Sequence, residues 1–75
     1  MSRQNEASPK YAPAREDGVK PWAVKWSSWG ETREYIVYAA KASEAAYAVK
    51  GRQMYVYTEA RRATPEDVER LREYR

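Results

Sequence analysis

The stretch from Trp22 to Trp29 constrains the fold of this chain most, because it holds all three of its tryptophans. Apolar side chains recur along it with a period of two, at Trp22, Val24 and Trp26. That alternation is typical of a β-strand with one buried face and one mostly polar face. Large aliphatic side chains are scarce elsewhere, since Leu71 and Ile36 are each the only residue of their kind. We therefore expect a sheet whose core depends on covering these indole rings.

Length and composition restrict the class of protein. A chain of 75 residues is one small domain at most. It has no cysteine and no histidine, which excludes disulfides, the usual general base and a plausible zinc site. Its three glycines are isolated, so no phosphate-binding loop is present. We predict a protein that is not an enzyme and that carries no cofactor.

The first 20 residues are polar and rich in charges, prolines and small side chains. Such a segment cannot offset its ordering entropy by burial, so we predict a disordered tail over residues 1–20 and a folded domain over residues 21–75. The tail is either a solubilising extension or a binding arm. No stretch of the sequence is apolar enough to span a membrane, and the N-terminus lacks the apolar run of a signal peptide. We expect a cytoplasmic protein.

A turn at Gly30-Glu31-Thr32 and a second strand from Arg33 to Ala40 follow the tryptophans. A loop of two or four residues places Tyr35, Val37 and Ala39 on the face of the tryptophans, whereas a loop of odd length exchanges the faces. The even loop is the preferred prediction.

The remaining elements are indicated by a change of period and by helix caps. Alanines at helical spacing predict a helix from Lys41 to Lys50, with Gly51 just beyond its end. Alternation predicts a third strand from Gln53 to Glu59, and Thr64-Pro65 is a typical helix start. That last helix is expected to dock weakly on the edge of the domain and to fray at Arg75. In the first helix, the alanine face packs on the sheet or, alternatively, contacts a helix of a partner.

These elements predict a β-β-α-β-α order and an α+β fold. If the third strand pairs with the first, the three-stranded sheet is antiparallel with the order second-first-third. One short helix would then cover one face of it.

Two groups of residues are candidates for binding. If Met54, Val56 and Thr58 face the core, Tyr55 and Tyr57 point outward near Lys25, with Ile36 and Tyr38 beside them. Exposed aromatic and basic side chains on a sheet suit single-stranded bases, and they equally suit a protein interface. Burial of these tyrosines by the last helix is the structural alternative.

The second group is basic: Arg61 and Arg62, with Arg52 near the start of the third strand. Exposed arginines bind carboxylates or phosphates bidentately, although they also protect a sheet edge from aggregation. Trp29 has no obvious role in the core and is added to the candidates.

Three segments resemble the short phage-encoded inhibitors of bacterial RNA polymerase. They are Lys20 with Trp22-Ala23 at the first strand, the run from Val37 through Ala40 to Ser43-Glu44-Ala45, and the strand from Met54 to Thr58 that leads to Arg61 and Arg62. The resemblance covers roughly Lys20 to Arg62. It implies an interaction protein in which Arg61 and Arg62 meet an acidic surface of the polymerase. The helix that follows Thr64 departs from the pattern.

Two functions are consistent with these features. In the first, the chain is a small interaction protein that binds and inhibits or modulates a larger host protein such as RNA polymerase. In the second, it is a nucleic-acid-binding module that uses the same tyrosines and basic residues. A net charge of +3 is modest for nucleic-acid binding and favours the first. We expect a monomer or a weak homodimer, without membrane association.

Overall fold

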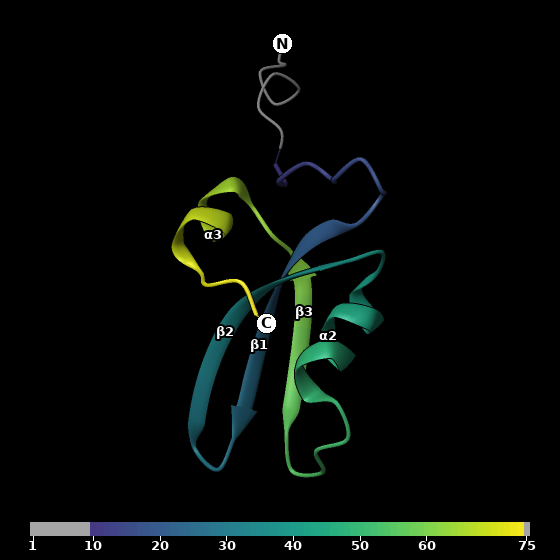
Figure 1. Cartoon of the computed structure of the whole chain (residues 1–75). Coiled ribbons are helices and arrows are strands. Elements are labelled where there is room, and N and C mark those ends of the chain that lie inside the picture. The colour runs from purple at the N-terminus through teal and green to yellow at the C-terminus, as the bar shows by residue number, and fades with distance from the viewer. Residues whose placement is uncertain (1–9, 75) are drawn as a thin grey trace.

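Three strands form one antiparallel sheet in the order β2-β1-β3, with the tryptophan-rich strand at its centre (Figure 1). The computed structural model describes residues 10–74, in which β1 spans Lys20–Ser28, β2 spans Glu31–Ala39 and β3 spans Tyr57–Arg62. Helix α2 (Ala42–Lys50) connects β2 to β3, and helix α3 (Pro65–Arg70) follows β3. The predicted α+β fold and its strand order are confirmed.

The hairpin between β1 and β2 has a two-residue loop. Ser28 pairs with Glu31, so Trp29 and Gly30 alone form the turn. Because this loop is even, the face that carries the tryptophans of β1 also carries Tyr35 and Val37 of β2, as predicted. The turn precedes the expected Gly30-Glu31-Thr32 by one residue, and β2 therefore starts at Glu31.

One face of the sheet packs against α2. Its buried core consists of Val24, Val37, Ala39, Ala45 and Val49, with Trp22, Trp26, Tyr35 and Ala60 packed around it. The indole Nε1 of Trp22 donates a hydrogen bond to the carbonyl oxygen of Ala39 at 2.9 Å. Ala45 is fully buried, so the small side chains of α2 bring the helix close to the sheet and leave room for the indoles, as the alanine pattern predicted.

The opposite face is covered at one end by the C-terminal region. Ala23, Ile36 and Ala63 are buried there beneath Val68 and Leu71. Helix α3 begins as predicted, with Thr64 as N-cap and Pro65 in the first turn, and it adds a capping box in which Asp67 closes on Thr64. The helix ends at Arg70. Arg75, where fraying was expected, lies outside the described residues.

Beyond α3 the chain becomes extended and lies along β2. The backbone N–H of Ile36 donates to Arg72 O at 2.9 Å, and the N–H of Tyr74 donates to Ile36 O at 2.9 Å. Residues 72–74 thus form a short parallel contact at the outer edge of β2.

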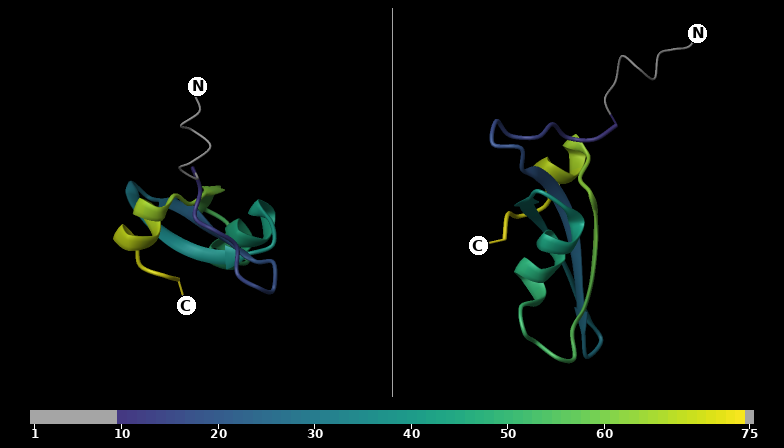
Figure 2. Two further views of the ribbon diagram at one scale, coloured as in Figure 1. Left: turned by 90° about the horizontal axis from the view of Figure 1, so that it is seen from above. Right: turned by 90° about the vertical axis from the view of Figure 1, so that its right-hand side faces the viewer.

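The third strand lies later than predicted. It covers Tyr57–Arg62 rather than Gln53 to Glu59, and Met54, expected in the core, is 79% exposed. The physical reason is the path of the chain: α2 lies in a separate layer from the sheet (Figure 2), so the residues after Gly51 must cross back before they can pair. Of the predicted inward residues, Val56 is buried and Thr58 pairs opposite Trp26.

Residues 10–19 lie across the end of the sheet (Figure 1), within the segment 1–20 for which disorder was predicted. Residues 1–9 of that segment lie outside the described residues. Ala63 N donates to Pro21 O at 3.1 Å, but proline has no N–H to return the bond. The N–H of Ala12 supplies the missing donor to Ala63 O at 2.9 Å. The guanidinium of Arg15 lies 3.6 Å from the ring centroid of Tyr38. The N-terminal segment therefore covers the ring of Tyr38.

Gly51 ends α2 with φ 59° and ψ −130°, a conformation that residues with a Cβ rarely adopt. A Cβ added there would meet no atom within 4 Å, so the cost of a side chain is a backbone cost alone. We expect Gly51→Ala to lower the free energy of unfolding by about 1–2 kcal/mol. Urea denaturation should show a lower midpoint with an unchanged slope; an unchanged midpoint would contradict this conformation.

Candidate protein-binding surface

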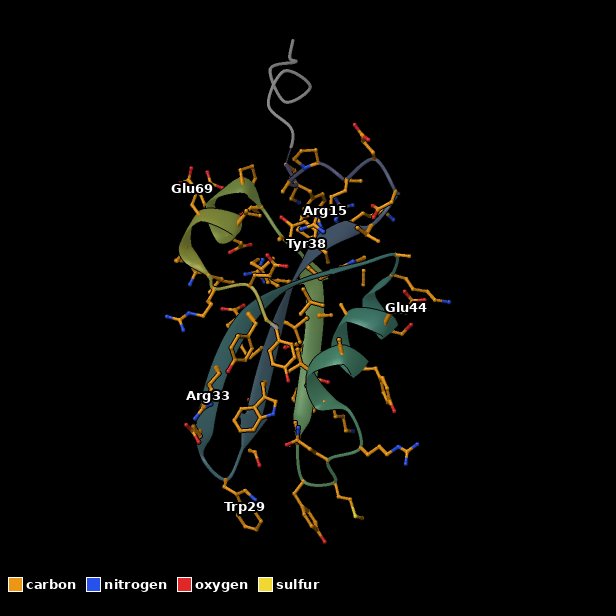
Figure 3. The ribbon with its side chains drawn as sticks, in the orientation of Figure 1. Arg15, Trp29, Arg33, Tyr38, Glu44 and Glu69 are labelled. Atoms are coloured by element: carbon orange, nitrogen blue, oxygen red, sulfur yellow. The ribbon has the colours of Figure 1, made fainter. Side chains whose placement is uncertain are left out.

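Four large apolar side chains are exposed at the end of the molecule that is opposite the N-terminal segment. They come from the hairpin turn, from the α2–β3 connection and from the first residue of β3. They are exposed by 88%, 79%, 73% and 63%: Trp29, Met54, Tyr55 and Tyr57. Figure 3 shows Trp29 at the tip of the hairpin, far from Arg15 and Tyr38. We call these four residues the distal patch.

The hairpin turn and the α2–β3 connection hold each other in place. The Ser28 hydroxyl donates to the carbonyl oxygen of Tyr55 at 2.7 Å, which links the end of β1 to the connection. The rings of Trp29 and Tyr55 have centroids 6.0 Å apart and are tilted by 54°, within the range of favourable aromatic pairs. The two most prominent rings of the patch are therefore positioned relative to each other.

Trp29 adopts an unfavourable backbone conformation. Its φ is 51°, and within residues 10–74 it is the only residue other than glycine with a positive φ. A two-residue hairpin turn with positive φ at both positions favours Asn-Gly or Gly-Gly, and a bulky side chain in the first position is costly. The stability of the domain does not explain a tryptophan that is both strained and almost fully exposed. Such outliers point to a function.

Arg61, predicted to meet a partner, is engaged within the chain. Its guanidinium donates to the Asp67 carboxylate at 2.7 Å and 3.2 Å and to Glu34 at 3.4 Å. The hydrogen bonds from Arg61 outweigh burial and hold the pKa of the Asp67 carboxyl well below its usual range, with help from Thr64 and Arg70. The same contact with Asp67 raises the pKa of Arg61. This arginine supports α3 against the sheet.

Arg62 points to the other face of the sheet, because successive residues of a strand alternate. It donates to the carbonyl oxygen of Ala12 at 2.9 Å, and its guanidinium lies 5.1 Å and 5.7 Å from the ring centroids of Tyr11 and Trp22. Arg61 and Arg62 therefore do not form one basic cluster, although they are neighbours in the sequence.

Lys25 has an acidic residue as its neighbour on each adjacent strand. It pairs across the sheet with Glu34 on β2 and with Glu59 on β3. These three residues line a shallow cavity of about 390 Å³ together with Arg61. The mixed charges of this cavity make it a poor site for phosphate.

The predicted open face of aromatic and basic side chains is not assembled. Ile36 is buried beneath the C-terminal region, Tyr38 lies under Arg15, and Tyr55 belongs to the α2–β3 connection rather than to a strand. Tyr57 does point to the same face as Lys25, as expected. The alternative, burial of some of these tyrosines by the last helix, applies to neither Tyr55 nor Tyr57, since both are exposed. Tyr38, in contrast, is half-buried in the cluster that also contains Val68 and Leu71.

Of the predicted site residues, Trp29 and Tyr55 pack against each other, and Tyr57 lies at the start of β3, opposite Ser27. Arg52 is exposed in the connection that also carries Met54 and Tyr55. Met54 itself was missed because its alternation with Val56 resembles that of a strand.

Other kinds of site find no support in the described part of the chain. Among residues 10–74 there is no group of acidic side chains placed to hold a metal ion, and no helix has the length and apolarity to cross a membrane. Comparison of the chain with protein-family models, with curated proteins and with solved structures found no match.

Proposed function

We propose that this protein is a small, non-enzymatic interaction protein that binds a larger protein through its distal patch. The observation that carries this proposal is Trp29, an 88%-exposed tryptophan held at a backbone position that favours asparagine or glycine. Tryptophan, tyrosine and arginine are the side chains most enriched among the energetic anchors of interfaces. The patch offers two tyrosines beside the tryptophan, and Arg52 on the same connection.

Charge supports a protein partner over a nucleic acid. Arg61 is paired with Asp67 and Glu34, and Arg62 is bound to the N-terminal segment. Lys25 has Glu34 and Glu59 as its neighbours on the adjacent strands. Binding to a phosphate backbone needs several free cations on one surface. The distal patch presents aromatic area with one nearby arginine instead.

Bacterial RNA polymerase is the candidate partner that the sequence resemblance supplies, and modulation of its activity is the role that follows. Because Arg61 and Arg62 are engaged within the chain, Arg52 is the arginine that would contact an acidic surface of the polymerase. The distal patch would provide the apolar anchors.

The test uses the immobilised full chain and purified bacterial RNA polymerase. Combining Trp29→Ala with Tyr55→Ala should weaken binding by roughly 30-fold or more, since anchors of this type are worth about 2 kcal/mol or more. Tyr47→Ala is the matched control, because Tyr47 is an exposed tyrosine (60%) on α2, outside the patch. It should change binding less than about twofold.

Salt separates the two functions. Binding through the distal patch should change little between low and physiological salt, whereas binding to nucleic acid should weaken steeply. Failure of the polymerase to bind would exclude it as the partner. The broader proposal would fail if no protein captured from nuclease-treated bacterial lysate depended on Trp29 and Tyr55.

A further inference from the structure

The outer edge of β2 offers more backbone hydrogen-bonding groups than the chain uses. In an antiparallel pair, successive residues point their N–H and C=O groups alternately toward the neighbouring strand and away from it. Ile36 points both groups outward, because they bond to Arg72 and Tyr74. Thr32 and Glu34, four and two residues earlier, share that orientation. Within residues 10–74 their outward groups have no backbone partner.

A cleft lies beside this edge, on the face that α2 covers. It has a volume of about 190 Å³ and is lined by Trp26, Arg33, Tyr35, Val49, Gln53 and Tyr74. Sites for whole small molecules usually have volumes of roughly 300–1,000 Å³, so this cleft has the size for one side chain. Its aromatic walls favour an aromatic side chain, and Arg33 and Gln53 supply polar groups at the cleft.

The chain's own C-terminal residues lie along this edge, and Tyr74 forms one wall of the cleft. Residues 72–74 lie along the edge as an extended segment, and the Tyr74 ring meets Tyr35 edge-on, with centroids 5.1 Å apart. This arrangement has the form of strand addition, in which backbone bonds at a sheet edge give affinity and a side-chain pocket gives specificity.

The segment is held by few contacts. It satisfies only the two outward groups of Ile36. Tyr74 remains 38% exposed, and the ion pair between Glu73 and Arg15 is long, at 4.0 Å, between half-exposed side chains. Exposed pairs of that kind contribute little. An extended peptide that also reached Glu34 and Thr32 would satisfy four further backbone groups.

We propose that the outer edge of β2 and the adjacent cleft lined by Tyr35 form a binding site for a partner protein. The partner would bind through an extended peptide segment, and an aromatic side chain of that segment would enter the cleft. The chain's own residues 72–74 cover the Ile36 end of this edge and one side of the cleft in the absence of the partner, and they compete with it. The site is separate from the distal patch and does not depend on the function proposed for that patch.

The probe is a fluorescently labelled peptide with the sequence of residues 69–75, tested by fluorescence anisotropy against the full chain. Tyr74→Pro removes from the protein both the ring and the N–H that donates to Ile36. The peptide should bind this variant with an affinity at least about tenfold higher than its affinity for the unaltered chain, because residues 72–74 no longer compete for the edge of β2. A peptide in which the tyrosine is replaced by alanine should lose that binding.

Two variants serve as controls. Glu73→Ala removes only the contact with Arg15 and should leave peptide affinity unchanged within about twofold. Trp29→Ala with Tyr55→Ala should also leave it unchanged, which separates this site from the distal patch. If Tyr74→Pro fails to fold by circular dichroism, Tyr74→Ala replaces it, with the same direction of change.

Amide chemical shifts locate the peptide. Shifts at Thr32, Glu34 and Ile36 would support the proposal, and shifts confined to residues around Trp29 would overturn it. Equal affinity for the unaltered and Tyr74→Pro chains would also overturn it. A third result would also overturn it: the unaltered chain forms a dimer, Tyr74→Pro abolishes the dimer, and the peptide does not bind. Residues 72–74 would then be exchanged between two copies of the chain.

Discussion

Replacing Asp67 with alanine should lower the free energy of unfolding by about 2–3 kcal/mol, the largest effect on stability that we expect from one side chain. The Asp67 carboxylate is 5% exposed and accepts hydrogen bonds from Arg61, from Arg70 at 3.0 Å and from Thr64 N at 2.9 Å. Loss of the cap accounts for about 1 kcal/mol of this value. The ion pairs account for about 1–2 kcal/mol, because both arginine side chains are more than half exposed and the pairs are partly screened.

Thermal unfolding measures this effect directly. A domain of this size should lose about 10–20 °C in Tm for a change of that magnitude. Glu66→Ala is the matched control, because Glu66 lies in the same first turn but is exposed. A loss for Asp67→Ala no larger than for Glu66→Ala would show that the network around Asp67 contributes no more than a surface charge.

The Asp67 carboxylate should make the free energy of unfolding depend on pH in the acidic range. Its pKa in the folded chain lies below the ordinary value of 3.8, mainly because of Arg61. A depressed pKa contributes stability that is present above the unfolded pKa and is lost as the pH falls through the folded one. The difference in stability between the unaltered chain and Asp67→Asn should therefore be constant above about pH 5 and shrink as the pH falls below about 4. A constant difference down to pH 2 would contradict this assignment.

The elements that could be predicted from the sequence are those in which a local pattern and the tertiary structure agree. The alternation of Trp22, Val24 and Trp26 predicted β1 correctly, because these side chains all lie on the face of the sheet that packs in the core beneath α2. The start of α3 at Thr64 and Pro65 survives because a helix cap is a local interaction. β3 was misplaced because Met54 and Val56 alternate like a strand, whereas the path back from α2 decides where pairing begins.

The candidate site was predicted less well, for a reason that the sequence itself contained. Arg61 and Arg62 are adjacent in a strand, so the period of two already requires them to point to opposite faces. Pro21 at the strand start likewise required a donor from elsewhere, which Ala12 supplies. The positive φ of Trp29 had no such signal, because the turn was placed one residue later.

Replacing Trp29 with asparagine should have opposite effects on stability and on binding. Asparagine tolerates the φ of 51° far better than tryptophan, and relief of that strain is worth about 1 kcal/mol. The indole contributes less than this to folding, since it is 88% exposed and contacts the ring of Tyr55 only at a tilt, with the centroids 6.0 Å apart. We therefore expect the variant to be more stable by about 0.5–1 kcal/mol in urea denaturation.

Binding of the partner should nevertheless fall by tenfold or more in the same variant, because an anchor side chain has been removed. Trp29→Phe is the informative companion: it keeps an aromatic ring on the strained backbone, so stability should stay near that of the unaltered chain and binding should be partly retained. If Trp29→Asn were instead less stable, the indole would contribute more to folding than its conformation costs. The case for a functional role of Trp29 would then be lost, since a residue that the fold needs requires no partner to explain it.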